Sequence, residues 1–175
     1  PGGPTDWGIS LAFLQSTGDL DNDGWQDGDL NKDCKVNFDD IKYLTKVEAE
    51  RLYHNYFWDQ LKLDAIEDQH IATKVFDLAV NIGPRSATKV LQRAVRAALG
   101  LKLVQDGIMG YKTLHAANAA KPEKLIVALK SEAAGFYRLL VQQKPKFFIF
   151  EKGWLNRAYA DPVIETRKVD ESKRV

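Results

Sequence analysis

The feature that most constrains the fold is a series of apolar side chains three or four residues apart. Ile126, Leu129, Ala133, Phe136 and Leu140 follow this spacing, which places them on one face of a long amphipathic helix. A β-strand cannot present them together, because its side chains alternate between two faces. The pattern therefore predicts a mostly α protein.

Glycine and proline divide the middle of the chain into further helices. Gly83 is expected to end one helix and Pro84 to begin the next, which runs to Gly100. The apolar stripes of these two helices are Ile71, Val75, Leu78, Ile82, Val90, Leu91 and Val95. We expect a short helix after the turn "DGIMGYKTL" and a final aromatic helix over "KFFIFEKGWLNRAY". Strands are expected only in a short hairpin near residues 102–109.

Shorter helices are predicted at the beginning of the chain. The apolar residues from Trp7 to Leu14 indicate a helix that ends near Gly18. Thr45 and Glu48 have the spacing of a capping box, in which each side chain bonds to the other residue's backbone. They predict the start of a helix over "KVEAERLYHNYFW".

A chain of 175 residues suits one compact domain or a domain with two lobes. Charge is distributed unevenly along it. Residues 19–40 contain eight aspartates but only Lys32 and Lys35, whereas the rest of the chain has 23 basic and 16 acidic residues. A basic body suits an anionic polymer such as nucleic acid or cell wall, although a merely soluble surface explains it equally well. The basic residues form no concentrated patch, which disfavours nucleic acid.

The sequence predicts neither a membrane-spanning helix nor an intrachain disulfide. No apolar run reaches the roughly 18 residues that a membrane helix needs, so we predict no membrane-spanning segment. Cys34 is the only cysteine, so no intrachain disulfide stabilises the fold.

The strongest chemical pattern is "DLNKDCKVNFDD". Asp29, Asn31 and Asp33 occupy positions 1, 3 and 5 of an EF-hand-type calcium loop, Lys35 offers its carbonyl at position 7, and Asp40 falls at position 12. Oxygen ligands around one Ca²⁺ would explain why so many aspartates tolerate one another. We therefore predict a structural calcium ion; a solvated acidic loop is the alternative.

This loop departs from the usual pattern in two ways. Cys34 replaces the glycine of position 6, and Asp40 has a shorter side chain than the usual glutamate. An upstream group could form an incomplete second loop or share ligands with the first; it comprises Asp19, Asp21, Asp23 and Asp27. A dockerin repeat has a similar sequence, but dockerins use two such repeats, each with its own helix.

Several stretches together resemble glycoside hydrolase family 108, the phage-type N-acetylmuramidases. "PGGPTDWGIS" resembles the segment that follows their catalytic glutamate. "VFDLAVNIGPRSATKVLQRAV" resembles the start of their peptidoglycan-binding region, while "DGIMGYKTL" and "FEKGWLNR" resemble its turn and closing helix. The acidic loop is an insertion in this likeness.

The resemblance implies a lysozyme-like helical fold and hydrolysis of the β-1,4 bond between N-acetylmuramic acid and N-acetylglucosamine. The family's general acid is a glutamate in an E-G-G motif, followed by N-D-P-x-D-x-G-G-x-T. Pro1 falls inside that motif, so the resemblance places the acid upstream of Pro1. We expect the chain from Pro1 to Val175 to be inactive by itself.

The resemblance also suggests site residues. Thr5 matches the motif threonine, which implies an auxiliary catalytic role in holding the attacking water; a helix cap is an equal alternative. Trp7 is a candidate for substrate binding, although packing in the core is the favoured expectation. Asn81 and Gly83 lie at a helix end that faces the cleft in this family, where Asn81 could bond an N-acetyl group or simply end the helix.

The resemblance divides the chain by function. It implies a muramidase lobe over residues 1–70 with the insertion at 19–40, a peptidoglycan-binding region over 71–165 and a charged tail over 166–175. We predict peptidoglycan as the partner and calcium as the cofactor, with no organic cofactor. The expected site of action is the bacterial cell wall, for a phage endolysin or for an exported or periplasmic enzyme.

Other functions are less well supported by the residues. Glu48, Glu50 and Glu67 lack the apolar surroundings that would make one of them a general acid. The three histidines have no metal spacing, which disfavours a zinc amidase. The main alternative is a calcium-stabilised module that binds peptidoglycan without cleaving it, followed by a dockerin-like interaction protein and then by a nucleic-acid-binding protein.

Overall fold

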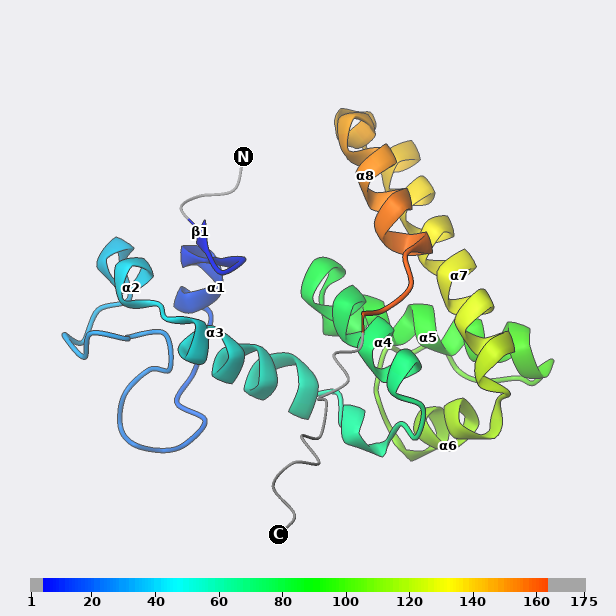
Figure 1. Ribbon diagram of the computed structural model, residues 1–175, viewed down its shortest axis with the longest axis horizontal. Helices are drawn as coiled ribbons and strands as arrows, with labels where there is room; N and C mark the ends of the chain where they lie inside the picture. The colour runs from blue at the N-terminus through cyan, green and yellow to red at the C-terminus, as the bar shows by residue number, and fades with distance from the viewer. Residues whose placement is uncertain (1–4, 164–175) are drawn as a thin grey trace, which may run out of the picture. The chain divides into compact units, whose positions relative to one another are not determined.

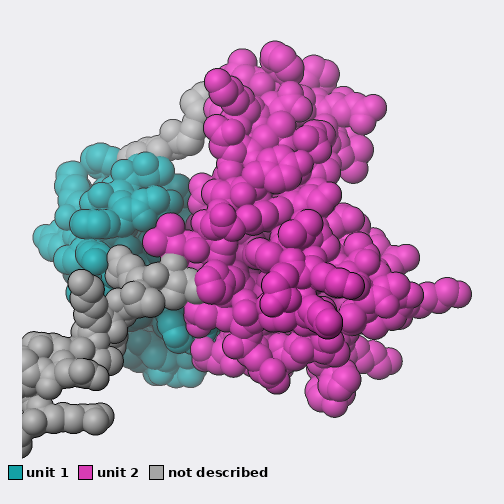
Figure 2. Space-filling model, turned by 45° about the vertical axis from the view of Figure 1, so that its right-hand side comes forward, with its two compact units in different colours: residues 1–61 teal, residues 62–175 magenta. Residues whose placement is uncertain are grey.

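The computed structural model describes residues 5–163 and confirms the mostly helical class. The chain forms two compact units, Pro1–Leu61 and Lys62–Val175 (Figures 1 and 2). The predicted boundary between functional regions at residue 70 stays a prediction, and the predicted tail over 166–175 lies outside the described residues. None of the described helices combines the length and hydrophobicity needed to cross a membrane.

The first unit consists of short elements joined by an irregular loop over residues 16–37. Its elements are β1 (Thr5–Asp6), β2 (Ile9–Ser10), α1 (Leu11–Gln15), α2 (Phe38–Tyr43), α3 (Lys46–Tyr53) and the π-helical segment η1 (His54–Asp59). Its small core contains Ile9, Leu14, Ile41, Leu44, Ala49 and Leu52. Because so few apolar side chains are buried, polar contacts must contribute substantially to the order of the loop.

The first unit begins with a hairpin, so the helix predicted from Trp7 is wrong at its start. β1 and β2 pair antiparallel, and Trp7 and Gly8 form the turn between them with φ angles of 48° and 78°. Two successive positive φ angles give a two-residue turn the twist that paired strands need. Helix α1 starts only after Ser10, whose side chain accepts a hydrogen bond from the Phe13 N–H at 3.2 Å.

Polar caps define the starts of α2 and α3. The Thr45 side chain accepts from the Glu48 N–H at 3.2 Å, which confirms the predicted start of α3. At α2, Asn37 and Asp40 form a capping box, in which the Asn37 N–H donates to Asp40 Oδ2 at 2.8 Å. Asp40 therefore links the end of the acidic loop to the first turn of α2.

The second unit is a packed set of longer helices. Its elements are the 3-10 turn η2 (Leu63–Ala65), α4 (Gln69–Ile82), α5 (Pro84–Leu99), α6 (Tyr111–Ala119), α7 (Pro122–Gln143), the 3-10 turn η3 (Pro145–Phe147) and α8 (Phe148–Tyr159). Helix α5 packs on α4 and α7, and α8 runs along α7 (Figure 1). The predicted ends are confirmed: Gly83 separates α4 from α5, and Gly100 ends α5 in the left-handed conformation.

Helix α7 confirms the predicted long helix, but its buried face is turned slightly from the predicted one. Leu129 and Ala133 are fully buried as expected, whereas Phe136 and Leu140 are only half-buried. The complete buried set is Leu125, Leu129, Ala133, Ala134, Tyr137 and Val141. This rotation could not be predicted, because apolar residues extend around much of the helix.

A buried lysine holds the end of α8 against α4. Lys74 is 2% exposed, and its Nζ donates to the carbonyl oxygens of Arg157 at 2.7 Å and Ala160 at 2.9 Å. Burial lowers the pKa of Lys74. The cation satisfies carbonyls at the C-terminal end of a helix, where the helix dipole favours positive charge.

Candidate functional site

The hairpin displays two of the predicted site residues. Thr5 is exposed in β1 and pairs with Ser10 across the hairpin. It does not cap α1, since Ser10 has that role, so the cap interpretation of Thr5 is wrong. Trp7 is 53% exposed, and the expectation that it packs in the core is also wrong. The turn is held by the Tyr53 hydroxyl, which donates to the Trp7 carbonyl at 3.2 Å.

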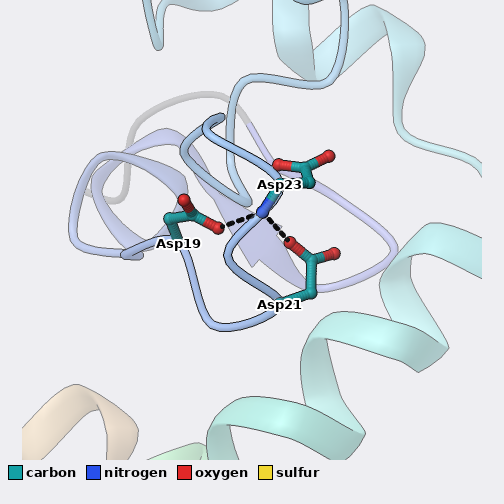
Figure 3. A group of neighbouring side chains, drawn as sticks. All are labelled: Asp19, Asp21 and Asp23. Carbon is teal, nitrogen blue, oxygen red and sulfur yellow. Dashed lines mark hydrogen bonds between the residues drawn. The ribbon is translucent and has the colours of Figure 1, made fainter.

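The upstream acidic residues form a closed loop. The two carboxylate oxygens of Asp19 accept from the N–H groups of Asp23 at 3.1 Å and Gly24 at 3.0 Å. Asp21 also accepts from the Asp23 N–H, at 3.2 Å (Figure 3). Ligand atoms of Asp19, Asp21 and Asp23 all lie within 4.8 Å of one another, and all three residues are exposed. Oxygen donors of this kind suit a hard cation such as Ca²⁺.

The downstream loop repeats this hydrogen-bond pattern. Asp29 accepts from the N–H groups of Asp33 at 3.1 Å and Cys34 at 2.8 Å. Asn31 also accepts from the Asp33 N–H at 3.0 Å, and Asp33 accepts from the Lys35 N–H at 2.9 Å. Asp29, Asn31 and Asp33 therefore lie in one tight turn, as expected for positions 1, 3 and 5 of a twelve-residue loop.

Both loops also share backbone conformations. Gly24 and Cys34 follow the third acidic or amide position of their loops and have φ angles of 89° and 68°. Asn22 and Lys32, two residues earlier, are left-handed as well. Cys34 thus adopts the conformation that glycine normally supplies at position 6, and the departure seen in the sequence does not prevent the turn.

Asp40 closes the downstream loop from inside the protein. Its side chain is fully buried, and its Oδ1 accepts from the N–H groups of Leu30 at 2.8 Å and Asn31 at 3.3 Å. Its Oδ2 accepts from the Asn37 N–H. The residue at position 12 is therefore tied to both ends of the loop.

Asp27 closes the upstream loop in the way that Asp40 closes the downstream loop. Its Oδ2 accepts from the Leu20 N–H at 3.1 Å and from the Tyr56 hydroxyl at 2.7 Å, while its Oδ1 accepts from Arg51 Nη1 at 2.9 Å. Burial favours the neutral acid, but these hydrogen bonds outweigh it and lower the pKa of Asp27. Burial, followed by the Asp27 contact, raises the pKa of Tyr56 to about 12.

A pocket of about 400 Å³ lies beside these loops and α3. Trp25 and Tyr43 contribute aromatic surface, while Glu48 and Arg51 contribute charge. Its volume lies in the range of small-ligand sites. Glu48 accepts from Arg51 Nε at 3.0 Å, so this pocket contains an ion pair rather than a carboxyl in apolar surroundings.

Asn81, a candidate glycan ligand, is already part of a polar network in the second unit. Its amide lies between Tyr137 and Arg157: with Nδ2 toward the Tyr137 hydroxyl at 3.2 Å, its Oδ1 accepts from Arg157 Nη1 at 3.0 Å. Arg157 also donates from Nη2 to Asp77 at 2.7 Å. Burial raises the pKa of Tyr137 to about 12. Gly83, with a φ of 84°, makes the adjoining bend between α4 and α5.

A buried glutamine fixes the turn before α6, where the predicted hairpin over residues 102–109 proves wrong. Gln92 is 1% exposed; its Nε2 donates to Asp106 Oδ1 at 2.8 Å, and its Oε1 accepts from the Gly107 N–H at 3.0 Å. A hydrogen bond from the Ile108 N–H, followed by the one from Gln92, lowers the pKa of Asp106. These bonds satisfy polar groups of the segment without strand pairing. Nothing in the sequence pattern indicated that Gln92 has this role.

No glutamate within residues 5–163 has a buried side chain. Glu48 pairs with Arg51, Glu50 lies 3.5 Å from Lys46, and Glu67 is exposed. A general acid that works near neutral pH needs surroundings that disfavour its charged form. The described part of the chain therefore offers no glutamate suited to that role.

The chain matches known proteins in two consecutive segments. Residues 1–83 match the family model Glycosyl hydrolase 108, and residues 86–159 match the model Predicted Peptidoglycan domain. The first match includes α4, although α4 packs within the second compact unit. The boundary between the matched families therefore differs from the boundary between the compact units.

A solved structure, that of Brucella abortus SagA, is similar to this chain with a TM-score of 0.68 and 28% sequence identity. The similarity covers 90% of this chain and 76% of that one. No curated protein matches the chain. The two family models confirm the resemblance found in the motifs: residues 1–83 match glycosyl hydrolase family 108, and residues 86–159 match the predicted peptidoglycan domain.

Proposed function

We propose that the protein is an N-acetylmuramidase that cleaves the β-1,4 bond between N-acetylmuramic acid and N-acetylglucosamine in peptidoglycan. The observation that carries this proposal is the hairpin at Thr5–Ser10, which lies in the glycosyl hydrolase 108 segment and exposes the threonine of the family motif. The adjoining predicted peptidoglycan domain supports the same substrate.

Hydrolysis needs an acid that protonates the leaving oxygen, and a water or nucleophile on the opposite side of the sugar. The family resemblance assigns the acid to the glutamate of the E-G-G motif. By the order of the family motifs, this glutamate lies upstream of Pro1. Asp27 is unsuited to this role because its hydrogen bonds to Tyr56 and Arg51 outweigh burial and lower its pKa. Glu48 is held in an ion pair with Arg51 rather than in apolar surroundings.

Thr5 is proposed to hold the attacking water. Its position in a paired strand limits its backbone freedom, and its exposure leaves the side chain accessible. In an active chain that includes E-G-G, Thr5→Ala should reduce kcat, whereas Thr5→Ser should retain much of it because the hydroxyl remains. Equal loss in both variants would assign Thr5 a packing role.

The second unit is proposed to bind the glycan strand. Its exposed side chains near the Asp106–Gly107 turn include Ile108 and Tyr111, which are 66% and 80% exposed. The network around Asn81 holds the helix end on which the predicted N-acetyl contact depends. Recovery on insoluble peptidoglycan above that of an unrelated basic protein would support specific binding.

Calcium is proposed to stabilise the acidic loops. The proposed oxygen donors are Asp29, Asn31, Asp33, the Lys35 carbonyl and Asp40, with Asp19, Asp21 and Asp23 as a second group. These carboxylates accept mainly from backbone N–H groups, and Asp23 also accepts from Lys32 Nζ at 3.3 Å. A bound cation would offset the repulsion among them. This role is structural, since the loops contain no carboxyl in the surroundings of a general acid.

The bond cleaved can be identified from the products of digestion. An active chain should release fragments whose reducing ends are N-acetylmuramic acid, as mass spectrometry of reduced products would reveal. Reducing-end N-acetylglucosamine would indicate cleavage of the other glycosidic bond and contradict the proposal. Release of peptides without new reducing ends would indicate an amidase or peptidase.

A non-enzymatic peptidoglycan-binding module is the second candidate. The match of residues 86–159 to the predicted peptidoglycan domain supports it, since binding alone needs no general acid. This candidate predicts that peptidoglycan binds the protein and remains intact even when the chain includes the E-G-G motif. Measuring binding and product release on the same sample separates the two functions.

A further inference from the structure

The joined ends of α7 and α8 carry an apolar surface that the helices of the second unit leave exposed. Phe148, Ile149 and Phe150, at the start of α8, are 69%, 78% and 49% exposed. In Figure 1 this end of the helix pair extends beyond α4, α5 and α6. We call residues 144–152 the hairpin tip. Adjacent large apolar side chains at such exposure mark an interaction surface.

The hairpin tip is attached to the helices by aromatic packing on its inner side. The Trp154 ring stacks between Tyr137 of α7, at 5.3 Å between ring centroids, and Phe150, at 5.6 Å. The Phe147 ring packs edge-on against Trp154 at 5.7 Å. These contacts fix the start of α8 while Phe148 and Ile149 remain outside the aromatic stack.

Lysines surround the apolar residues of the hairpin tip. The Nζ atoms of Lys144 and Lys146 lie over the Phe147 ring, 5.9 Å and 5.4 Å from its centroid. Lys152 follows Phe148 by one helical turn and lines the same shallow surface. Glu151 is the only acidic residue within 144–152. Over residues 62–163 the chain has 16 basic and nine acidic residues, so the tip belongs to a basic unit.

We propose that the hairpin tip docks on the surface of an anionic lipid bilayer. Phe148 and Ile149 would enter the interfacial layer, while the lysine side chains extend their ammonium groups to the lipid phosphates. Each lysine near an anionic membrane adds electrostatic attraction, and aromatic and aliphatic side chains add apolar burial. The docking is peripheral and reversible.

The charge pattern favours lipid over the other occupants of such a surface. A symmetric contact with a second copy would bring two sets of Lys144, Lys146 and Lys152 together, where like charges repel. A glycan is bound mainly through hydrogen bonds made beside an aromatic face. Phe148 and Ile149 instead present exposed apolar side chains, with the polar groups of Glu151, Lys152 and Asn156 next to them. An anionic bilayer complements both the lysines and the apolar side chains.

Flotation of the 175-residue chain with lipid vesicles tests this proposal without involving peptidoglycan. The chain should float with vesicles of phosphatidylcholine mixed with phosphatidylglycerol, and much less with phosphatidylcholine alone. Phe148→Ser combined with Ile149→Ser should lower the partition coefficient about tenfold or more, because apolar burial is lost. Lys144→Gln combined with Lys146→Gln should weaken binding and its dependence on salt.

Matched variants control for general changes in hydrophobicity and charge. Val104→Ser combined with Val127→Ser alters two valines that are 72% and 67% exposed elsewhere in the unit, and should leave binding unchanged. Lys121→Gln combined with Lys124→Gln should have a smaller effect than the tip lysines. Unchanged circular dichroism and Tm would establish that the tip variants remain folded.

Three results would overturn the proposal. The first is no flotation with anionic vesicles, and the second is equal flotation of the wild type and the Phe148/Ile149 variant, which would leave only general charge attraction. The third is a concentration-dependent dimer that the same variant abolishes, together with unchanged vesicle binding. That result would assign the hairpin tip to a second copy of the chain.

Discussion

Arg51 Nη1 donates to Asp27 Oδ1 at 2.9 Å, which joins α3 to the acidic loop across a sequence separation of 24 residues. Asp27 is 6% exposed, so without this cation its carboxylate would lose its counter-charge in a partly dry environment. The same guanidinium also bonds Glu48 and the Asp27 carbonyl. One side chain thereby connects the loop to the core of the first unit.

We expect Arg51→Met to reduce the free energy of unfolding of the first unit by about 2 kcal/mol, since it leaves a buried carboxylate without its partner. Denaturant unfolding followed by tryptophan fluorescence measures the loss. Lys46→Met is the control, because Lys46 pairs with Glu50 at 3.5 Å on the exposed side of α3. A loss for Arg51→Met no larger than for the control would contradict the anchoring role.

Stability should also depend on pH through Asp27. Its pKa is lowered from the ordinary value of 3.8, so the folded state binds this proton less readily than the unfolded state. The resulting stabilisation is present above pH 3.8 and is lost as the pH falls through the lower folded pKa. Asp27→Asn should therefore flatten the acid side of the stability profile. Parallel profiles for the variant and the wild type would show that Asp27 contributes nothing to this dependence.

Gly28 is expected to tolerate no side chain. A Cβ atom there would lie 2.3 Å from the Leu14 carbonyl oxygen and 2.8 Å from Thr17 Oγ1, closer than atoms can pack. Gly28→Ala should destabilise the first unit by about 2–3 kcal/mol because the loop must move away from α1. Gly18→Ala, whose Cβ would meet nothing within 4 Å, is the matched control. Equal Tm values for the two variants would disprove this close approach.

Calcium should raise the Tm of the chain, and a chelator should lower it, because a ligand that binds only the folded state stabilises that state. Asp29→Ala removes a proposed ligand and should reduce the calcium-dependent change. Asp39→Ala removes an exposed carboxylate outside the proposed set, which pairs with Lys42, and should preserve it. Isothermal calorimetry that detects no calcium binding, with a chelator-independent Tm, would contradict the site.

The helical framework could be predicted because its signals are local. Gly83 and Pro84 specify a bend through their own backbone preferences, and the spacing of Leu129 and Ala133 reports the period of α7. The aspartate spacing likewise indicated how Asp29 and Asp33 fold into one turn. In each case the interacting residues lie close together in sequence.

The remaining features depend on residues distant in sequence. The Trp7–Gly8 turn is held by Tyr53, and apolar spacing there resembled a helix because the hairpin is too short to show alternation. Gln92 interrupts an apolar stripe, and nothing local indicates that it faces the Asp106 turn rather than solvent. The exposure of the start of α8 could not be predicted either, because an apolar residue such as Phe148 is equally compatible with a buried helix.

The measurement that tests the central claim most directly is clearing of purified cell-wall suspensions. A chain extended upstream to include the E-G-G motif should clear the suspension, and glutamine in place of its glutamate should reduce the rate about 10²–10⁴-fold, the usual contribution of a general acid. The chain from Pro1 to Val175, folded and calcium-loaded, should produce little clearing. Strong clearing by that chain, or an unimpaired glutamine variant, would mean that another carboxylate acts as the acid and would contradict the account.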